Sequence, residues 1–217
     1  MSADVVCPAE VRAVVNAMTI DVEDYFQVSA FEGLAPRHRW DEFESRVCAN
    51  TERLLSLFDE SGVKATFFIL GWVAERHTAL VRRIADNGHE IASHGYAHRL
   101  VYDLTRPAFR DDTRRAKAIL ENVTGRRVVG YRAPSYSITP RSLWALDILI
   151  EEGFLYDASI FPIHHDRYGL PVSPRHVYVI DRDGGSLIGG FLVGEPRRET
   201  LVERPWRNKL CGLGLLP

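Results

Sequence analysis

Hydrophobic and polar positions along the chain follow two periods that alternate. Apolar residues recur every three or four positions over about residues 42–60, 80–85 and 143–150, which predicts amphipathic helices. Short apolar runs, which predict strands, occupy about residues 14–20, 63–70, 89–93, 128–132 and 154–157. Strands that alternate with helices in this way predict βα units and a mostly parallel sheet.

The junctions between these elements carry their own signals. Four glycines stand where a predicted helix gives way to a strand, namely Gly62, Gly88, Gly125 and Gly153. Glycine readily takes the left-handed conformation that ends a helix, so each is expected to be a helix C-cap. Thr105 with Pro107, and Thr139 with Pro140, are expected to begin helices, because each pair supplies a capping hydroxyl and a proline in the first turn.

Composition sets the broad class. The 217 residues are 46% hydrophobic and 26% charged, with a net charge of −2, which is typical of one soluble domain and gives no electrostatic reason to expect nucleic acid binding. No apolar run approaches the ~20 residues of a membrane span, so no membrane insertion is expected. Cys7, Cys48 and Cys211 are few and far apart, which predicts free thiols. With no secretory signal in residues 1–12, we expect a cytoplasmic protein.

Polar side chains follow the predicted strands where each strand ends. Asp21, Glu23 and Asp24 follow the first, His94 and His98 the third, Arg132 the fourth, and Asp157 the fifth. The carboxyl ends of parallel strands hold the active site in barrels and in open α/β sheets. Two imidazoles four residues apart, together with a carboxylate, are ligands typical of a catalytic divalent metal with an open position. The sequence therefore predicts a metal-dependent hydrolase.

Two further interpretations concern individual residues. His89 and Glu90 suggest a zincin motif, but the next histidine is His94, five residues on, and on a helix the two would point about 140° apart. That interpretation fails. Arg132 stands at a strand end that is expected to face a carboxylate cluster, so a pairing role is favoured over an ordinary surface charge.

Four segments resemble successive motifs of one family. Residues 19–24, 93–98, 131–137 and 156–162 are similar to motifs of the polysaccharide deacetylase family, the NodB-homology, carbohydrate esterase 4-type group. Residues 21–26 and 161–169 resemble a bacterial branch associated with exopolysaccharide synthesis. The resemblance covers about residues 14–175 and implies a distorted (β/α)7 barrel. It agrees with the alternation of strands and helices.

The resemblance also implies a chemistry. The enzyme would be a hydrolase acting on carbon–nitrogen but not peptide bonds, and would remove N-acetyl groups from a polysaccharide or its oligosaccharide precursor. His94 and His98, with a carboxylate, would hold a divalent metal, usually zinc, that polarises the acetyl carbonyl. Asp21 would be the general base, and Arg132 would orient it and keep it ionised. Backbone N–H groups near Ser135 and Tyr136 would join the metal in stabilising the oxyanion.

The sugar groove and the third metal ligand follow from the same resemblance. Tyr136, Tyr156 and Asp157 would shape the groove. The family has adjacent aspartates, of which the second binds the metal, whereas Val22 occupies that place here. Strand alternation puts Glu23 on the same side as Asp21, so Glu23 is the favoured ligand and Asp24 the alternative.

A second departure concerns the general acid. The family carries a histidine in a Leu-x-His context on a late strand, and no histidine follows residue 180 here. His164, His165 and His176 are weaker substitutes, because their surroundings favour loops. We expect a catalytic domain over residues 1–185 and a divergent, poorly packed tail over residues 186–217 that resembles a truncated end. The barrel would then lack its last strand or strands.

Two other functions stay open. A related amidohydrolase could open a small cyclic amide, because barrels of this type host several such substrates and the fold does not fix the function. The missing histidine also allows a catalytically impaired remnant that binds a metal or a glycan.

Overall fold

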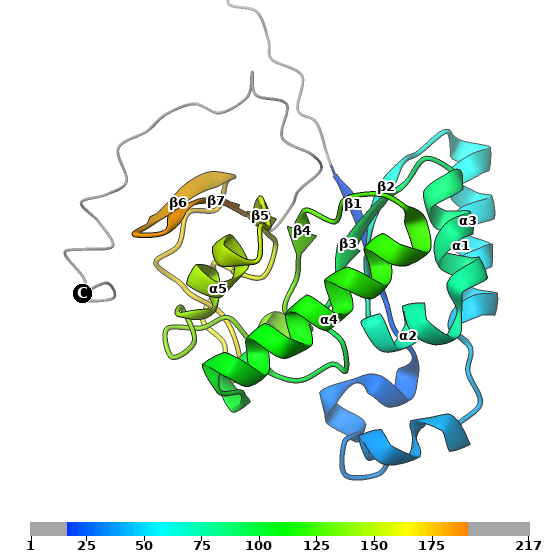
Figure 1. Cartoon of the computed structure of the whole chain (residues 1–217), viewed down its shortest axis with the longest axis horizontal. Helices are drawn as coiled ribbons and strands as arrows, with labels where there is room; N and C mark the ends of the chain where they lie inside the picture. Colours follow the sequence, from blue (N-terminus) through cyan, green and yellow to red (C-terminus); the bar gives the residue numbers. More distant parts are fainter. Residues whose placement is uncertain (1–16, 191–217) are drawn as a thin grey trace, which may run out of the picture.

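The computed structural model describes residues 17–190, which form one seven-stranded sheet flanked by helices (Figure 1). The order across the sheet is β1-β2-β3-β4-β5-β7-β6, and every pairing is parallel except the one between β6 and β7. The strands are β1 Met18–Val22, β2 Ala65–Ile69, β3 Glu90–Ser93, β4 Gly130–Tyr131, β5 Tyr156–Asp157, β6 Tyr178–Arg182 and β7 Gly185–Gly189. No pairing joins β1 to β6 within these residues, so the sheet is an open, distorted barrel.

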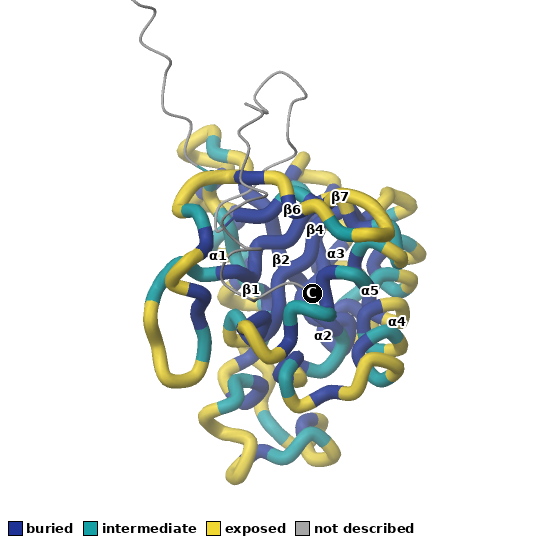
Figure 2. The backbone as a smooth tube through the Cα atoms, turned by 90° about the vertical axis from the view of Figure 1, so that its left-hand side faces the viewer, coloured by how far each residue is buried: buried dark blue, intermediate teal, exposed yellow. Residues whose placement is uncertain are grey.

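Helices form the outer layer. The α-helices are α1 Val47–Ser61, α2 Gly71–Arg76, α3 Thr78–Asp86, α4 Arg106–Thr124 and α5 Ala145–Glu151. Short 3-10 helices are η1 Tyr25–Gln27, η2 Ser29–Phe31, η3 Arg37–Glu42, η4 Val101–Asp103 and η5 Pro134–Tyr136. Figure 2 shows the buried strands inside and the exposed segments around them. Among the described residues no helix has the length and apolar character that crossing a membrane requires.

The predicted junctions are largely confirmed. All four glycines at the helix ends have positive φ, including 64° at Gly62 and at Gly125. The Thr105 hydroxyl accepts a hydrogen bond from the Ala108 N–H and caps α4. Thr139 does not begin a helix, because α5 starts only at Ala145. A turn precedes it, in which the Thr139 N–H donates to Ser142 Oγ at 2.9 Å.

The five predicted strands are present, but a hairpin was missed. β6 alternates buried and exposed residues and pairs with β7, whose Leu187 is buried. β7 in turn lies parallel to β5. The predicted boundary between residues 185 and 186 therefore falls inside a strand, and the packed part extends at least to Gly189. Residues 191–217 of the predicted tail, and Cys7 and Cys211, lie outside the described residues, whereas Cys48 is a free thiol.

Strand register positions the site. The last residue of each parallel strand pairs with the last residue of its neighbour, through Val22, Ile69, Ser93, Tyr131, Asp157 and Gly189. The residues that follow these ends therefore share one rim of the sheet. Phe68, Ala92 and Tyr156 belong to a small apolar cluster, separate from the larger core that contains the buried residues of the helices.

Gly130 provides a test of this inner packing. A Cβ at Gly130 would lie 2.1 Å from the Tyr156 ring, which is fully buried and has no room to move. We expect Gly130→Ala to lower the free energy of unfolding by about 3 kcal/mol, because overpacking strains a filled core. Gly33→Ala is the matched control, since a Cβ there would meet nothing within 4 Å. Urea unfolding of both variants measures the difference, and equal stabilities would contradict the packing described here.

Candidate metal centre and active site

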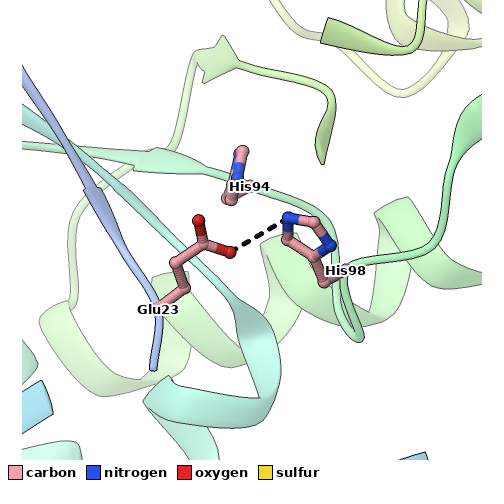
Figure 3. Close-up of side chains that lie close together, drawn as sticks. All are labelled: Glu23, His94 and His98. Carbon is pink, nitrogen blue, oxygen red and sulfur yellow. Dashed lines mark ion pairs between the residues drawn. The ribbon is translucent and has the colours of Figure 1, made fainter. Parts of the chain in front are cut away.

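Three metal-ligating side chains converge on the rim (Figure 3). Glu23 directly follows β1, His94 directly follows β3, and His98 lies in the loop after β3. One ligand atom from each lies within 4.8 Å of the other two. Glu23 Oε2 and His98 Nε2 are 3.0 Å apart. The carboxylate that the sequence favoured thus joins the two histidines.

The tautomer of His94 follows from its hydrogen bond. His94 Nδ1 lies 2.8 Å from the carbonyl oxygen of Arg132. A carbonyl can only accept, so Nδ1 carries the proton and Nε2 keeps its lone pair free for a metal. A hydrogen bond of this kind also fixes the orientation of the ring. Both histidines are almost completely buried, which keeps them in place.

The surroundings of these residues fit a cation. Glu23 Oε2 is buried, and within residues 17–190 it has no hydrogen-bond partner, although His98 lies within ion-pair distance. Burial acts to raise the pKa of Glu23, but the imidazoles of His98 and His94 outweigh it, and the pKa is lowered. Burial lowers the pKa of His94, which favours its neutral form. An ionised carboxylate and neutral imidazoles are the states in which these groups bind metal.

Two side chains from other segments form hydrogen bonds with the backbone of the loop that carries the histidines. The Asp112 carboxylate, on α4, accepts a hydrogen bond from the Tyr96 N–H at 2.7 Å. Arg37 Nε donates to the Ala97 carbonyl at 2.8 Å. His98 has a φ of 49°, which is uncommon for a residue other than glycine and persists only where neighbours enforce it. Sequence reasoning missed Asp112 and Arg37, because both act on backbone groups and belong to no motif quoted above.

Arg132, which is buried, and Asp21, which is partly exposed, form an ion pair beside the metal ligands. Arg132 Nη1 lies 2.7 Å from Asp21 Oδ1, and Nη2 donates to Thr19 Oγ1 at 3.1 Å. The guanidinium carbon lies 4.0 Å from the centre of the Phe68 ring. Arg132 is 3% exposed. The structure therefore brings together the two residues for which the sequence predicted pairing.

Asp24, the alternative ligand, lies elsewhere. Its carboxylate accepts hydrogen bonds from Ser45 Oγ at 2.7 Å, from the Arg46 N–H and from the Val47 N–H. It thus anchors the start of α1 and has no free oxygen aimed at the histidines. The physical reason is that extended alternation ends after Glu23, where the chain turns into η1. Asp24 is therefore not a member of the metal cluster.

Tyr156 and Asp157 are not placed to touch a sugar, because both are fully buried. The Tyr156 hydroxyl, on β5, donates to Glu90 Oε1, on β3, at 2.7 Å. The Asp157 carboxylate accepts from the Ser159 N–H and hydroxyl, and Ser159 Oγ accepts from the Ala133 N–H at 2.7 Å. The expectation that these two residues line the groove was wrong. Asp157 instead stabilises the loop that follows Arg132.

Tyr136 lies beside the site, half-buried, with its ring centre 5.9 Å from the guanidinium carbon of Arg132. Its N–H donates to the Ala133 carbonyl, which removes it from the expected oxyanion donors. The Ser135 N–H stays a prediction. Ser135 and Tyr136 both have a φ of 51°. Ser29, which no sequence signal marked, lies near both loops, with its hydroxyl 3.5 Å from His98 Nδ1 and 3.4 Å from Ser135 Oγ.

Comparisons with known proteins agree with this arrangement. The family model for polysaccharide deacetylase matches residues 40–149. A peptidoglycan deacetylase-like protein from Gibberella zeae is 37% identical over 155 residues, which is 70% of this chain and 45% of that protein. A solved structure from Mycobacterium smegmatis, described as a polysaccharide deacetylase, is 28% identical to this chain. The alignment covers 91% of this chain and 71% of that one, with a TM-score of 0.63.

A third likeness concerns the fold alone. The crystal structure of the Puue allantoinase aligns with a TM-score of 0.58 and 18% identity, over 80% of this chain and 59% of that one. The chain spans less than half the length of three curated relatives that it matches.

Fold and site together define an α/β protein with a candidate divalent-metal centre at the carboxyl ends of its parallel strands. The chain belongs to the polysaccharide deacetylase family.

The ligand assignment can be tested by metal binding alone. Glu23→Gln keeps the shape of the side chain but removes the charge that faces His98, so we expect Zn²⁺ affinity to fall at least about 100-fold. Asp24→Asn is the matched control and should leave Zn²⁺ affinity unchanged, because the carboxylate of Asp24 anchors α1. Competition titration with a zinc chelator measures both. If Asp24→Asn lost more affinity than Glu23→Gln, the assignment would be wrong.

Asp157 predicts a pH-dependent stability. Burial raises its pKa from 3.8 to about 6, against the hydrogen bonds from Ser159 and the charge of Arg132. The unfolded chain loses this proton near pH 4 and the folded chain only near pH 6, so stability falls as pH rises across that window and then levels off. We expect the free energy of unfolding of wild type, relative to Asp157→Asn, to fall by about 2–3 kcal/mol between pH 4 and 7. Urea titrations across this range measure the change, and a constant difference would contradict it.

Proposed function

We propose that this chain is a metal-dependent N-deacetylase, which hydrolyses the N-acetyl groups of a polysaccharide or of its oligosaccharide precursor. The observation that carries the proposal is the position of the Asp21–Arg132 ion pair beside Glu23, His94 and His98. A base and a metal centre on one rim are the parts that hydrolysis of an amide requires. Membership of the polysaccharide deacetylase family supports an acetylated glycan as the substrate.

The residues divide the work between them. Glu23, His94 and His98 would hold the metal, which when bound polarises the acetyl carbonyl and lowers the pKa of water. Arg132 occupies Oδ1 of Asp21, and within the described residues no hydrogen bond is made to Oδ2. Oδ2 is therefore the atom that would take the proton from the attacking water. The Arg132 carbonyl holds His94 at the same time, so base and metal ligand are oriented together.

We further propose zinc as the metal and an exopolysaccharide as the source of the glycan. A site of two imidazoles and one carboxylate with an open position is typical of catalytic zinc. Residues 21–26 and 161–169 support the second proposal, through their resemblance to the exopolysaccharide-associated branch.

One observation favours a second candidate, the impaired remnant. β7 reaches the rim beside β5, where a late-strand histidine would be expected. It ends there in Gly189, followed by Gly190, which offer no proton donor for the leaving amine. A remnant would bind zinc and release no acetate. A cyclic-amide hydrolase would open a ring instead, and the likeness to the allantoinase structure supports only its fold.

Acetate release from N,N′,N″-triacetylchitotriose by the zinc-loaded chain tests the proposal. We expect measurable turnover, and we expect Asp21→Asn to lower kcat by about 10²–10⁴-fold, because the general base is lost while the metal ligands stay. Zinc content should remain stoichiometric in this variant. Bound zinc without acetate release in wild type would favour the remnant. Ring opening of allantoin without acetate release would favour the cyclic-amide hydrolase.

A further inference from the structure

A cavity of about 430 Å³ lies under the loop that follows β5. The loop residues His164, His165, Arg167 and Tyr168 line one side of it, and Tyr102 and Arg141 line it from other segments. Tyr102 belongs to η4, and Arg141 to the turn before α5. The cavity has the size of a small-ligand site, and none of the roles assigned above involves it.

The charge around the cavity is predominantly positive. Arg141 and Arg167 form no ion pair within the described part of the chain, although ten other arginines there do. The one carboxylate of the lining, Asp166, is 82% exposed and lies 2.8 Å from His165 Nδ1. Arg141 and Arg167 therefore line this space without an ion-pair partner within residues 17–190.

A group of aromatic rings connects the cavity with the metal centre. The Tyr136 ring lies 5.9 Å from the guanidinium carbon of Arg132 and 5.9 Å from the ring of Tyr168. Tyr168 in turn stacks on Phe161, with an interplanar angle of 9°, and on His165. Aromatic surface thus runs from the ion pair of the active site to the wall of the cavity.

We propose that this cavity is a subsite for an anionic sugar residue, which belongs to the same glycan chain as the N-acetyl group that is removed. The inference rests on the proposed function and adds the class of the substrate, a glycan that carries carboxylate or phosphate groups. Guanidinium groups bind both kinds of anion through paired hydrogen bonds, and the rings offer apolar area to the faces of the sugars. A neutral glycan would gain only uncharged hydrogen bonds from these guanidinium groups, which are weaker than those to a carboxylate or a phosphate.

Binding of defined probes to the full-length, zinc-loaded protein tests the subsite without turnover. Calorimetric titration with trigalacturonate should show saturable binding, and the double variant Arg141→Gln/Arg167→Gln should weaken it at least about 10-fold, because hydrogen bonds to charged groups are lost. Arg175→Gln is the matched control, an exposed arginine of the segment before β6 that does not line the cavity. It should keep the wild-type affinity. Thermal unfolding checks that the variants are folded.

Two further probes decide between the outcomes. If glucose 1-phosphate binds, loses affinity in the double variant, and trigalacturonate does not bind, the subsite is supported. The anionic group that it recognises is then a phosphate. Binding of both anionic probes that is insensitive to the double variant, or no binding of either, overturns the subsite. So does an equal loss of affinity for neutral triacetylchitotriose. Acetate release is measured separately, so active enzyme without anion binding refutes only the subsite, and anion binding without acetate release refutes only the proposed deacetylase.

Discussion

The geometry of the site depends on the contacts of one buried residue, Arg132. Its side chain holds Asp21 from the first strand, and its carbonyl oxygen accepts the Nδ1 proton of His94 from the third. Burying this charge is costly, and it is offset by the ion pair, the hydroxyl of Thr19 and the face of Phe68. Replacing the Arg132 side chain would leave the Asp21 carboxylate without its ion-pair partner, whereas the backbone carbonyl that orients His94 would remain.

Backbone strain is concentrated at this rim. Within residues 17–190, the non-glycine residues with positive φ are His98, Ser135 and Tyr136, and all three border the site. Such conformations cost about 1–3 kcal/mol each and persist only where the surroundings enforce them. The residues that enforce them are distant in sequence. Asp112, on α4, accepts a hydrogen bond from the histidine loop, and Asp157 stabilises the loop after β4 through Ser159. Stability elsewhere in the fold therefore maintains the geometry of the site.

The rim is chemically uneven. Charged or metal-ligating residues directly follow strands β1, β3 and β4, whereas β7, beside β5, ends in Gly189 and is followed by Gly190. The rim thus holds residues for the proposed proton removal and metal binding, and β7 offers no side chain for the proposed proton delivery to a leaving amine. Beyond the rim, the aromatic residues Tyr136 and Tyr168 extend the surface toward Arg141 and Arg167, which form no ion pair within residues 17–190. Recognition of a long, charged glycan would engage this side of the molecule.

The sequence by itself determined the parallel strands, the glycine helix ends and the residue types at the strand ends, because these follow from local periodicity and backbone preference. It also indicated Glu23, since strand alternation is local. Only the tertiary structure decided that Asp24 anchors α1, that Tyr156 and Asp157 are buried, and that residues 185–189 form a strand. Those outcomes depend on which distant segments pack together, and no short window of sequence contains that information.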